Sequence, residues 1–334
     1  MVVKTPWTTY RSLKLIEEGQ AKERMPFLYS IEKDKRDSHE FIMITGYEGN
    51  ARDLVIPEVI DGIRVEAIGN HSFSARQDLM SVTLPQTIRT LYGFAFHNCR
   101  KLKKITLYDS IDDYYDGVCR QCDSLSDIEI TVDRGWFEVI RNFLADSDRT
   151  LRFRISVKRQ EPLEYEVSSL TFPEYVYDFN ENTMARTIQF SIAGSGMFYR
   201  ECVDRRSINY REYDRLFDKA RIDGGRTAED IAIGRLIFPV ELGEHSRSMY
   251  EEYVRGASGS ILNRLVEESD SDVSNIDVMK ALLSYGERLF DDKSIDEALR
   301  IATGRKMTEV CAILMNGHDS DTKDAKSAPM MFEL

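Results

Sequence analysis

The middle of the chain repeats itself at a fixed step of 23 residues. Three sets of apolar residues keep this step, each with one member in every repeat: Leu79, Leu102 and Leu125; Val82, Ile105 and Ile128; Leu84, Leu107 and Ile130. A single unit of this size cannot bury its own apolar face, whereas stacked units share one continuous core. The repeat therefore predicts a solenoid in which equivalent residues of successive coils lie side by side.

Each repeat contains a short segment in which apolar and polar residues alternate. Val82 and Leu84 are expected on one side of a strand and Thr83 on the other, because successive side chains point to opposite faces. A longer first unit contains residues 54–57 (LVIP), which match residues 82–85 (VTLP) at a step of 28. We expect the outward residues to form a column across a small parallel sheet: Val55, Thr83, Thr106 and Glu129, flanked by Lys104, Tyr108 and Asp127.

Several short motifs recur within the repeats. They are Ile56-Pro57, VEAIG (65–69), Ser72-Phe73, Leu79 and VTLP (82–85), then FAF (94–96), Cys99 and LKKITL (102–107), with ITGY (44–47) as a lead-in strand. These motifs resemble the BspA-like leucine-rich repeats of bacteria over roughly residues 28–132. The resemblance implies a right-handed solenoid that mediates binding, often at cell surfaces.

The array is expected to end after the third copy of the 23-residue unit. In that copy Tyr114 and Cys119 stand where earlier copies have aliphatic residues and a phenylalanine. Residues 133–157 are predicted to close the stack, because residues 136–144 have helical spacing and residues 151–157 (LRFRISV) alternate like an edge strand. Terminal caps are needed because an open apolar end would bind other chains.

The C-terminal half has the pattern of short amphipathic helices. They are predicted over residues 210–220, 227–238, 244–255, 260–268, 275–285, 296–303 and 308–316. Thr227 is the expected N-cap of the second helix, residues 294–297 have the spacing of a capping box, and Gly317 is expected to end the last helix. The short links predict an all-α, helical-repeat-like domain, and this half resembles an uncharacterised helical domain that accompanies similar repeats.

The predicted fold class is α+β, with a short leucine-rich-repeat solenoid of parallel strands followed by the helical domain. The predicted parts are an N-terminal lead-in (1–27), the repeat domain with caps (28–159), a connecting β and irregular segment (160–209), the helical domain (210–318) and a disordered tail (319–334). In the connecting segment, Gly194-Ser195-Gly196 is expected to form a tight turn between strands at 188–192 and 198–200. The aromatic residues there are expected to pack the halves together: Phe172, Tyr175, Tyr177 and Phe179.

Composition bears on partners and setting. The net charge of −12 disfavours a general affinity for nucleic acid or anionic lipid, since both need a basic face. No apolar run approaches the roughly 18 residues of a membrane span, so we expect no membrane insertion. Residues 1–20 lack the apolar stretch of a signal peptide, and the five cysteines show no regular pairing. These features predict a cytoplasmic protein, with the extracellular surface as the alternative if an export signal lies upstream.

The residue patterns that carry catalysis are missing, and we expect no enzyme, metal or cofactor. The histidines are scattered and none falls in a nucleophile or metal motif. Cys119 and Cys122 have C-x-x-C spacing, but Cys122 follows Cys99 by 23 residues, so the repeat already accounts for it. A zinc or redox site also needs further ligands, and no second C-x-x-C exists.

The leading prediction is a non-enzymatic module that binds protein partners or acts as a scaffold. The contact residues expected on the outward face are Lys104, Thr106, Tyr108 and Glu129. One alternative is a small-molecule receptor or enzyme with its site in residues 160–209, where Tyr199 and Arg200 form an unusual polar cluster. A second alternative is an exported surface adhesin. Partner identity and oligomeric state do not follow from the sequence.

Overall fold

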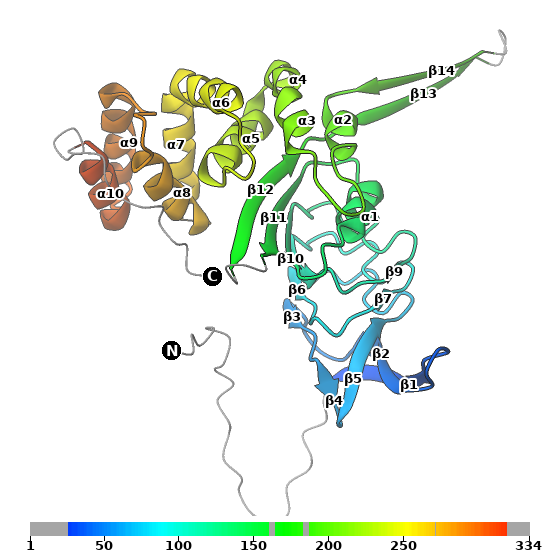
Figure 1. The fold of residues 1–334 in the computed structure, drawn as a ribbon. Helices are drawn as coiled ribbons and strands as arrows, with labels where there is room; N and C mark the ends of the chain where they lie inside the picture. Colours follow the sequence, from blue (N-terminus) through cyan, green and yellow to red (C-terminus); the bar gives the residue numbers. More distant parts are fainter. Residues whose placement is uncertain (1–25, 160–163, 183–186, 271, 319–334) are drawn as a thin grey trace, which may run out of the picture.

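The structure is a computed structural model that describes residues 26–159, 164–182, 187–270 and 272–318. It consists of a solenoid of short strands followed by a series of helices, which confirms the predicted fold class (Figure 1). The predicted tail and all but the last two residues of the predicted N-terminal lead-in lie outside the described residues.

Two sheets run along the solenoid. The first contains β1 (Phe27–Lys33), β2 (Glu40–Tyr47), β5 (Ile63–Ile68), β7 (Thr90–Leu91) and β9 (Asp113–Tyr114), with β4 (Val59–Ile60) paired to β5. The second contains β3 (Asp53–Val55), β6 (Ser81–Thr83), β8 (Lys104–Tyr108), β10 (Asp127–Val132), β11 (Leu151–Lys158) and β12 (Tyr165–Phe172). From β3 to β9 each coil contributes one strand to each sheet, so the apolar residues between the sheets form one core.

The register of the second sheet follows the sequence repeat. Val82 pairs with Ile105 and Ile105 with Ile128, in parallel strands. Leu79 and Leu102 are fully buried and Leu125 is 5% exposed, and all three belong to the same apolar core. The predicted stacking of equivalent residues is therefore confirmed.

The turns between the sheets also repeat, in backbone conformation and in hydrogen bonding. Ala75, Asn98 and Gln121 are 23 residues apart and all have a φ near +60°. The thiol of Cys99 donates a hydrogen bond to the carbonyl of Phe73 at 3.0 Å, and Cys122 donates equivalently to Phe96 at 3.0 Å. The cysteines thus belong to a ladder that ties each coil to the one before it.

A helix packs against the core after the last coil, where residues 136–144 were predicted to be helical. Helix α1 (Glu138–Asp146) buries Val139, Ile140, Phe143 and Leu144, and the ring of Phe143 meets Tyr114 at 5.3 Å. The expectation that residues 151–157 form an edge strand is wrong, because β11 pairs with β10 on one side and antiparallel with β12 on the other. The sheet thus continues past residue 159, where the predicted repeat domain ends.

The connecting segment forms a hairpin and a short helix. Strands β13 (Val176–Asn182) and β14 (Thr187–Ala193) pair and project from the body (Figure 1). The predicted strand at residues 198–200 is wrong, because helix α2 (Gly196–Arg200) follows β14 directly. Gly196 allows this turn: a Cβ atom there would lie 2.2 Å from the Pro173 carbonyl oxygen, so only glycine fits against that chain segment.

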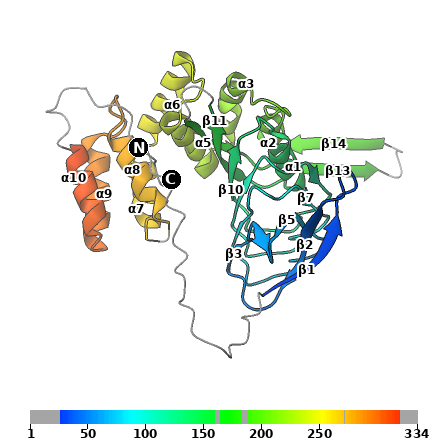
Figure 2. The same cartoon turned by 60° about the horizontal axis from the view of Figure 1, so that its bottom comes forward.

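The helical half contains helices at all the predicted places with shifted ends, but the single helix predicted over residues 210–220 is interrupted at Leu216 and forms two helices. They are α3 (Tyr210–Arg215), α4 (Phe217–Asp223), α5 (Gly225–Ile237), α6 (Glu244–Gly256), α7 (Ser258–Glu268), α8 (Ser274–Leu283), α9 (Asp292–Gly304) and α10 (Thr308–His318). In both views α5 lies next to the solenoid and the later helices extend away from it (Figure 2).

Three predicted helix signals in this half are wrong. Helix α5 begins before Thr227, after the turn made by Gly224, so Thr227 is not its N-cap. Asp291, rather than Ser294, caps α9, and its carboxylate accepts the backbone N–H of Ser294 at 2.8 Å. Gly317 lies inside α10 and does not end it. Helix α5 thus begins after a glycine turn, and α9 begins after an aspartate cap.

Candidate binding surface

The outward side chains of the second sheet form columns across the coils. One column follows the strand pairing and contains Val55, Thr83, Thr106, Glu129 and Arg154. These side chains are partly or fully exposed, and Val55 is 54% exposed although it is apolar. We call the outward side of β3, β6, β8 and β10 the strand face. It is the surface that the alternating pattern predicted.

The predicted contact residues lie together on the strand face. The ammonium of Lys104 pairs with Oε1 of Glu129 at 2.9 Å, and the hydroxyl of Thr106 donates to Oε2 of Glu129 at 3.4 Å. Tyr108 lies at the end of β8 beside Thr131. Burial and the negative charges of nearby carboxylates raise the pKa of Tyr108, so its phenol stays neutral at neutral pH.

Helix α5 covers the far end of the same sheet. Gly234 lies so close to β12 that a Cβ atom would stand 2.8 Å from the Ser169 carbonyl oxygen. The guanidinium of Arg154 lies 5.4 Å from the ring centre of Phe238, at the end of α5. The outward side of β11 and β12 is therefore occupied, and the strand face ends at β10.

A network of ion pairs runs from the strand face to the helices. Asp127 accepts two hydrogen bonds of 2.8 Å from Arg152, and Arg152 also lies 3.7 Å from Asp230 of α5. Arg264 of α7 meets Asp230 at 3.6 Å and Glu229 at 2.8 Å. Burial raises the pKa of Asp230, although these arginines favour its charged form. The network holds α5 against the solenoid.

The sequence analysis did not predict that Asp133 and Tyr165 meet at the border of the strand face. The phenol of Tyr165 donates to Oδ1 of Asp133 at 3.0 Å, and the amide of Gln86 donates to Oδ2 at 2.8 Å. Asp133 directly follows β10, so its position was open to prediction from the repeat. The position of Tyr165 was not, because it depends on the antiparallel pairing of β12 with β11.

Tyr199 and Arg200 lie inside the junction between the solenoid and the helices. Tyr199 has 0% exposure, its ring meets Tyr213 at 4.7 Å, and burial raises its pKa. The guanidinium of Arg200 donates to five carbonyl oxygens, those of Leu144, Ser147, Arg149, Pro173 and Gly196. Burial also lowers the pKa of Arg200 to about 10. Tyr199 is therefore not accessible to a ligand, and Arg200 holds the junction together.

The other aromatic residues of this segment differ in environment. Phe172 is fully buried against Phe153 at 5.5 Å, and Tyr175 stacks on the Arg200 guanidinium at 4.7 Å. The ring of Phe172 also meets Tyr213 of α3 at 5.9 Å, so Phe172 packs the two halves together, as predicted, whereas the contact of Tyr175 with Arg200 lies within the connecting segment. Tyr177 is 53% exposed, and the side chain of Phe179 lies outside the described residues.

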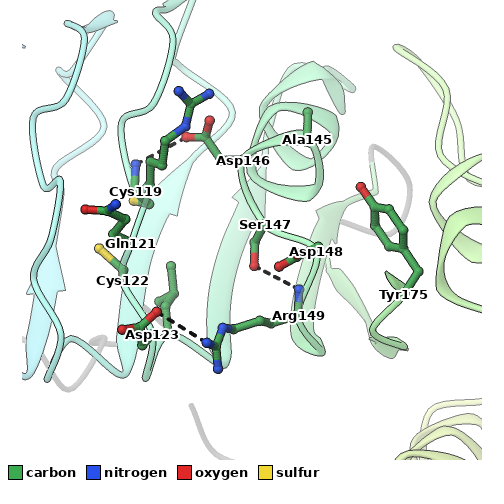
Figure 3. A pocket seen from close by; sticks show the side chains of 12 residues that line it. Cys119, Gln121, Cys122, Asp123, Ala145, Asp146, Ser147, Asp148, Arg149 and Tyr175 are labelled. Atoms are coloured by element: carbon green, nitrogen blue, oxygen red, sulfur yellow. Dashed lines mark hydrogen bonds and ion pairs between the residues drawn. The ribbon is translucent and has the colours of Figure 1, made fainter. Parts of the chain in front are cut away.

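A cleft of about 400 Å³ lies between the last coil and the segment that follows α1. Figure 3 shows its lining, with Cys119 and Cys122 on one wall and Tyr175 on the other. Asp123 and Arg149 form an ion pair of 3.4 Å within the cleft. Hydrogen bonding with the neighbouring thiol and burial raise the pKa of Cys122, so it remains protonated and is a poor nucleophile.

One group of potential metal ligands occurs in the described ranges. Asp34, Asp37 and His39 have ligand atoms within 4.8 Å of one another, on the loop between β1 and β2. The imidazole of His39 already bridges Asp37 at 2.6 Å and Glu66 at 3.0 Å. The hydrogen bond with Asp37 raises the pKa of His39. These contacts explain the cluster as a loop-stabilising ion pair.

A solenoid whose short parallel strands stack at a 23-residue step is a leucine-rich repeat fold. Residues 49–142 match the family model of the BspA type leucine rich repeat region, in six copies. This part of the chain is therefore a BspA-type leucine-rich repeat region, as the motifs indicated. Membership of this repeat family supports the interpretation of the region as a protein-interaction or scaffold module. Comparison with curated proteins gives no match.

Three solved structures are similar to parts of the chain. A leucine rich cell surface protein of Faecalibacterium prausnitzii A2-165 is 25% identical over 34% of this chain and 33% of that one, with a TM-score of 0.26. The leucine rich repeat protein of T. pallidum is 22% identical over 38% of this chain and 79% of that one, with a TM-score of 0.23. A leucine-rich repeat protein of Bacteroides ovatus ATCC 8483 is 15% identical over 31% of this chain and 48% of that one, with a TM-score of 0.19. The chain thus spans about a third of the first protein and about half of the third.

No helix among the described residues combines the length and the apolar character needed to cross a membrane.

Proposed function

We propose that the chain binds a protein partner through the strand face and acts without catalysis. The observation that carries this proposal is the register of β8 and β10. It brings Lys104, Thr106, Tyr108 and Glu129 together on a surface that α5 leaves open. Solenoids commonly use such extended faces for contact with other chains.

The chemistry of the strand face supports a protein partner of mixed character. Lys104 and Glu129 neutralise each other, and Thr83 and Thr106 offer hydroxyl groups between them and the apolar Val55. Tyr108 adds an aromatic ring, a residue type enriched in protein interfaces. A surface with paired charges gives little attraction to a polyanion, so nucleic acid is not the partner that we propose.

The non-catalytic part of the proposal rests on the state of the potential reactive groups. Burial and thiol hydrogen bonds raise the pKa of Cys99 and Cys122. His71 stacks on Phe94 at 5.2 Å, and the ring of His97 meets the same phenylalanine at 5.4 Å. These side chains have roles in packing.

We further propose a reducing, cytoplasmic setting. The cysteines are all free, and Cys99, Cys119, Cys122 and Cys202 are buried. Free thiols are usual where glutathione and thioredoxin keep cysteine reduced. The cell surface is the alternative setting, and fractionation of host cells with an antibody against the chain distinguishes the two.

An interaction screen with paired variants tests the binding surface. Thr106→Arg places a large cation in the centre of the strand face, and Thr90→Arg makes the same change on β7 of the other sheet. Affinity purification of each full chain from the native host, followed by mass spectrometry, should lose a partner with Thr106→Arg only. Retention of every partner by Thr106→Arg would contradict the proposal.

A further inference from the structure

The backbone ladder that connects the coils ends at the cleft beside the last coil. Within the stack, alternate amides of one turn donate to carbonyl groups of the next turn. Asn98 donates to Arg120 at 2.9 Å and Phe96 donates to Val118 at 2.8 Å, and the preceding turn repeats both bonds. These N–H groups therefore point along the solenoid toward the coil that follows.

The last turn has equivalent donors but no following coil. Cys119 and Gln121 lie one 23-residue step after Phe96 and Asn98. The carboxylate of Asp146 accepts the Cys119 N–H at 3.2 Å, so a side chain replaces the missing carbonyl there. The backbone N–H of Gln121 has no hydrogen-bond partner among the described residues. One rung of the ladder is thus left open.

The open rung lies at the cleft. Gln121 and Asn98 have nearly the same φ, +63° and +58°, at equivalent places in the repeated turn, so their N–H groups point in corresponding directions. Gln121 belongs to the lining of the cleft, whose volume of about 400 Å³ is within the range typical of ligand sites. Residues 145–149 form the opposite wall (Figure 3). The cleft therefore occupies the place of a further turn.

The charges of the lining limit what the cleft can bind. The lining contains three carboxylates and two guanidinium groups, those of Asp123, Asp146, Asp148, Arg120 and Arg149. Arg149 is paired with Asp123 at 3.4 Å, and Arg120 with Asp116 at 3.1 Å. An anion would find no unpaired cation among these lining residues. A neutral oxygen, such as a peptide carbonyl, is therefore the acceptor that suits the Gln121 N–H.

We propose that the cleft binds an extended, non-acidic peptide segment of another protein, which takes the place of a further turn. A carbonyl of this segment accepts the N–H of Gln121, as the carbonyl of a following coil would. Addition of an extended segment uses main-chain hydrogen bonds for affinity and side-chain contacts for specificity. Leu125, Ala145 and the ring of Tyr175 provide apolar contacts. The lining contains no residue of the strand face, so the proposal is independent of the strand-face partner.

Panning of a phage library of random peptides on the full chain tests the proposal. Synthetic copies of recovered peptides should bind with a Kd below about 0.1 mM and should contain few acidic residues. Isotope-labelled glutamine allows the exchange of the Gln121 amide with solvent to be followed by nuclear magnetic resonance. A bound peptide should slow this exchange at least about tenfold. Recovery of no peptide that slows it would overturn the proposal.

A variant that fills the cleft connects binding to its walls. Ala145 is exposed in the cleft lining, so Ala145→Trp should retain the wild-type thermal unfolding and weaken peptide binding at least about tenfold. The control Arg141→Trp, on the same helix but outside the lining, should change the affinity by less than about twofold. Unchanged affinity in Ala145→Trp would overturn the assigned site.

Sedimentation of the full chain distinguishes the other possible occupant. Dimerisation that depends on concentration and is lost in Ala145→Trp would place a second copy of the chain in the cleft. That result would overturn the assignment of the cleft to another protein, whereas a monomer in both forms supports it.

Discussion

The phenol of Tyr213 binds both backbone groups of Thr171. It donates to the Thr171 carbonyl at 2.7 Å and accepts the Thr171 N–H at 2.9 Å. Strand β12 is the last strand of its sheet, and its free edge would otherwise expose these groups to pairing with another chain. One side chain of α3 thus protects the edge of the solenoid sheet, and it connects the stability of the repeats to that of the helices.

Tyr213→Phe should lower the free energy of unfolding by about 2–4 kcal/mol, because it leaves two buried backbone groups without partners. Tyr210→Phe is the control, since the Tyr210 hydroxyl bonds a side chain, the hydroxyl of Ser168 at 3.1 Å, rather than a pair of backbone groups. Urea unfolding followed by circular dichroism measures both variants. Equal stability of Tyr213→Phe and the wild type would contradict this role for the phenol.

Gly117 stands at a turn position where the repeat requires a left-handed backbone, with φ of +69°. Gly117→Ala should cost about 1–2 kcal/mol for the backbone conformation alone. It should cost more in total, because the new Cβ would lie 2.7 Å from the ring of Phe94.

The control for this change is Gly135→Ala. Gly135 has a φ of +67°, and a Cβ atom added there would have no neighbour within 4 Å, so this variant measures the backbone cost only. Thermal unfolding of the two variants separates crowding from backbone strain. A larger loss for Gly135→Ala than for Gly117→Ala would contradict the stacking geometry.

Asp78 should make the first coils sensitive to acid. Hydrogen bonds from Arg76 and from the Ala51 amide lower the pKa of Asp78 from 3.8 to about 2. Since the folded pKa lies below the unfolded one, the stabilisation is fully present above pH 3.8 and is lost as the pH falls toward about 2. Asp78→Asn should flatten the pH dependence of urea unfolding in this window. An unchanged slope would show that the ion pair contributes nothing.

Arg235 and Asp214 form a buried ion pair in the helical half, with exposures of 0% and 3%. Arg235→Met should destabilise the chain by about 3–5 kcal/mol, because Asp214 would remain buried without its cation. Arg221→Met, which breaks an exposed pair with Asp218, should cost less than about 1 kcal/mol. A small effect of Arg235→Met in urea unfolding would contradict the predicted dependence on burial.

The sequence was sufficient to predict the solenoid, because the spacing of its repeated apolar residues equals the length of one coil. Leu79 and Leu102 recur at one step, and identical positions in a stack must contact each other. The alternation around Thr106 also determined which residues point outward. These features depend on local periodicity, which a single sequence contains in full.

Pairings between distant segments did not follow from the sequence. The match of β12 to β11 is antiparallel and outside the repeat, so no periodic signal specifies it. For the same reason the sequence did not predict the position of Arg200. Its polar cluster with Tyr199 suggested a binding site, but its carbonyl partners come from several segments. The packing of α5 against Ser169 of β12 is also a contact between distant segments, so the sequence did not predict it.

The strand face is tested most directly by a photo-crosslinking amino acid placed in the full chain in its native host. One variant carries benzoylphenylalanine in place of Tyr108, at the end of β8. The other carries it in place of Tyr115, which is 49% exposed beside β9 of the other sheet. We expect a crosslinked protein partner from position 108 and none from position 115. A partner crosslinked only from position 115 would contradict the assignment of the strand face.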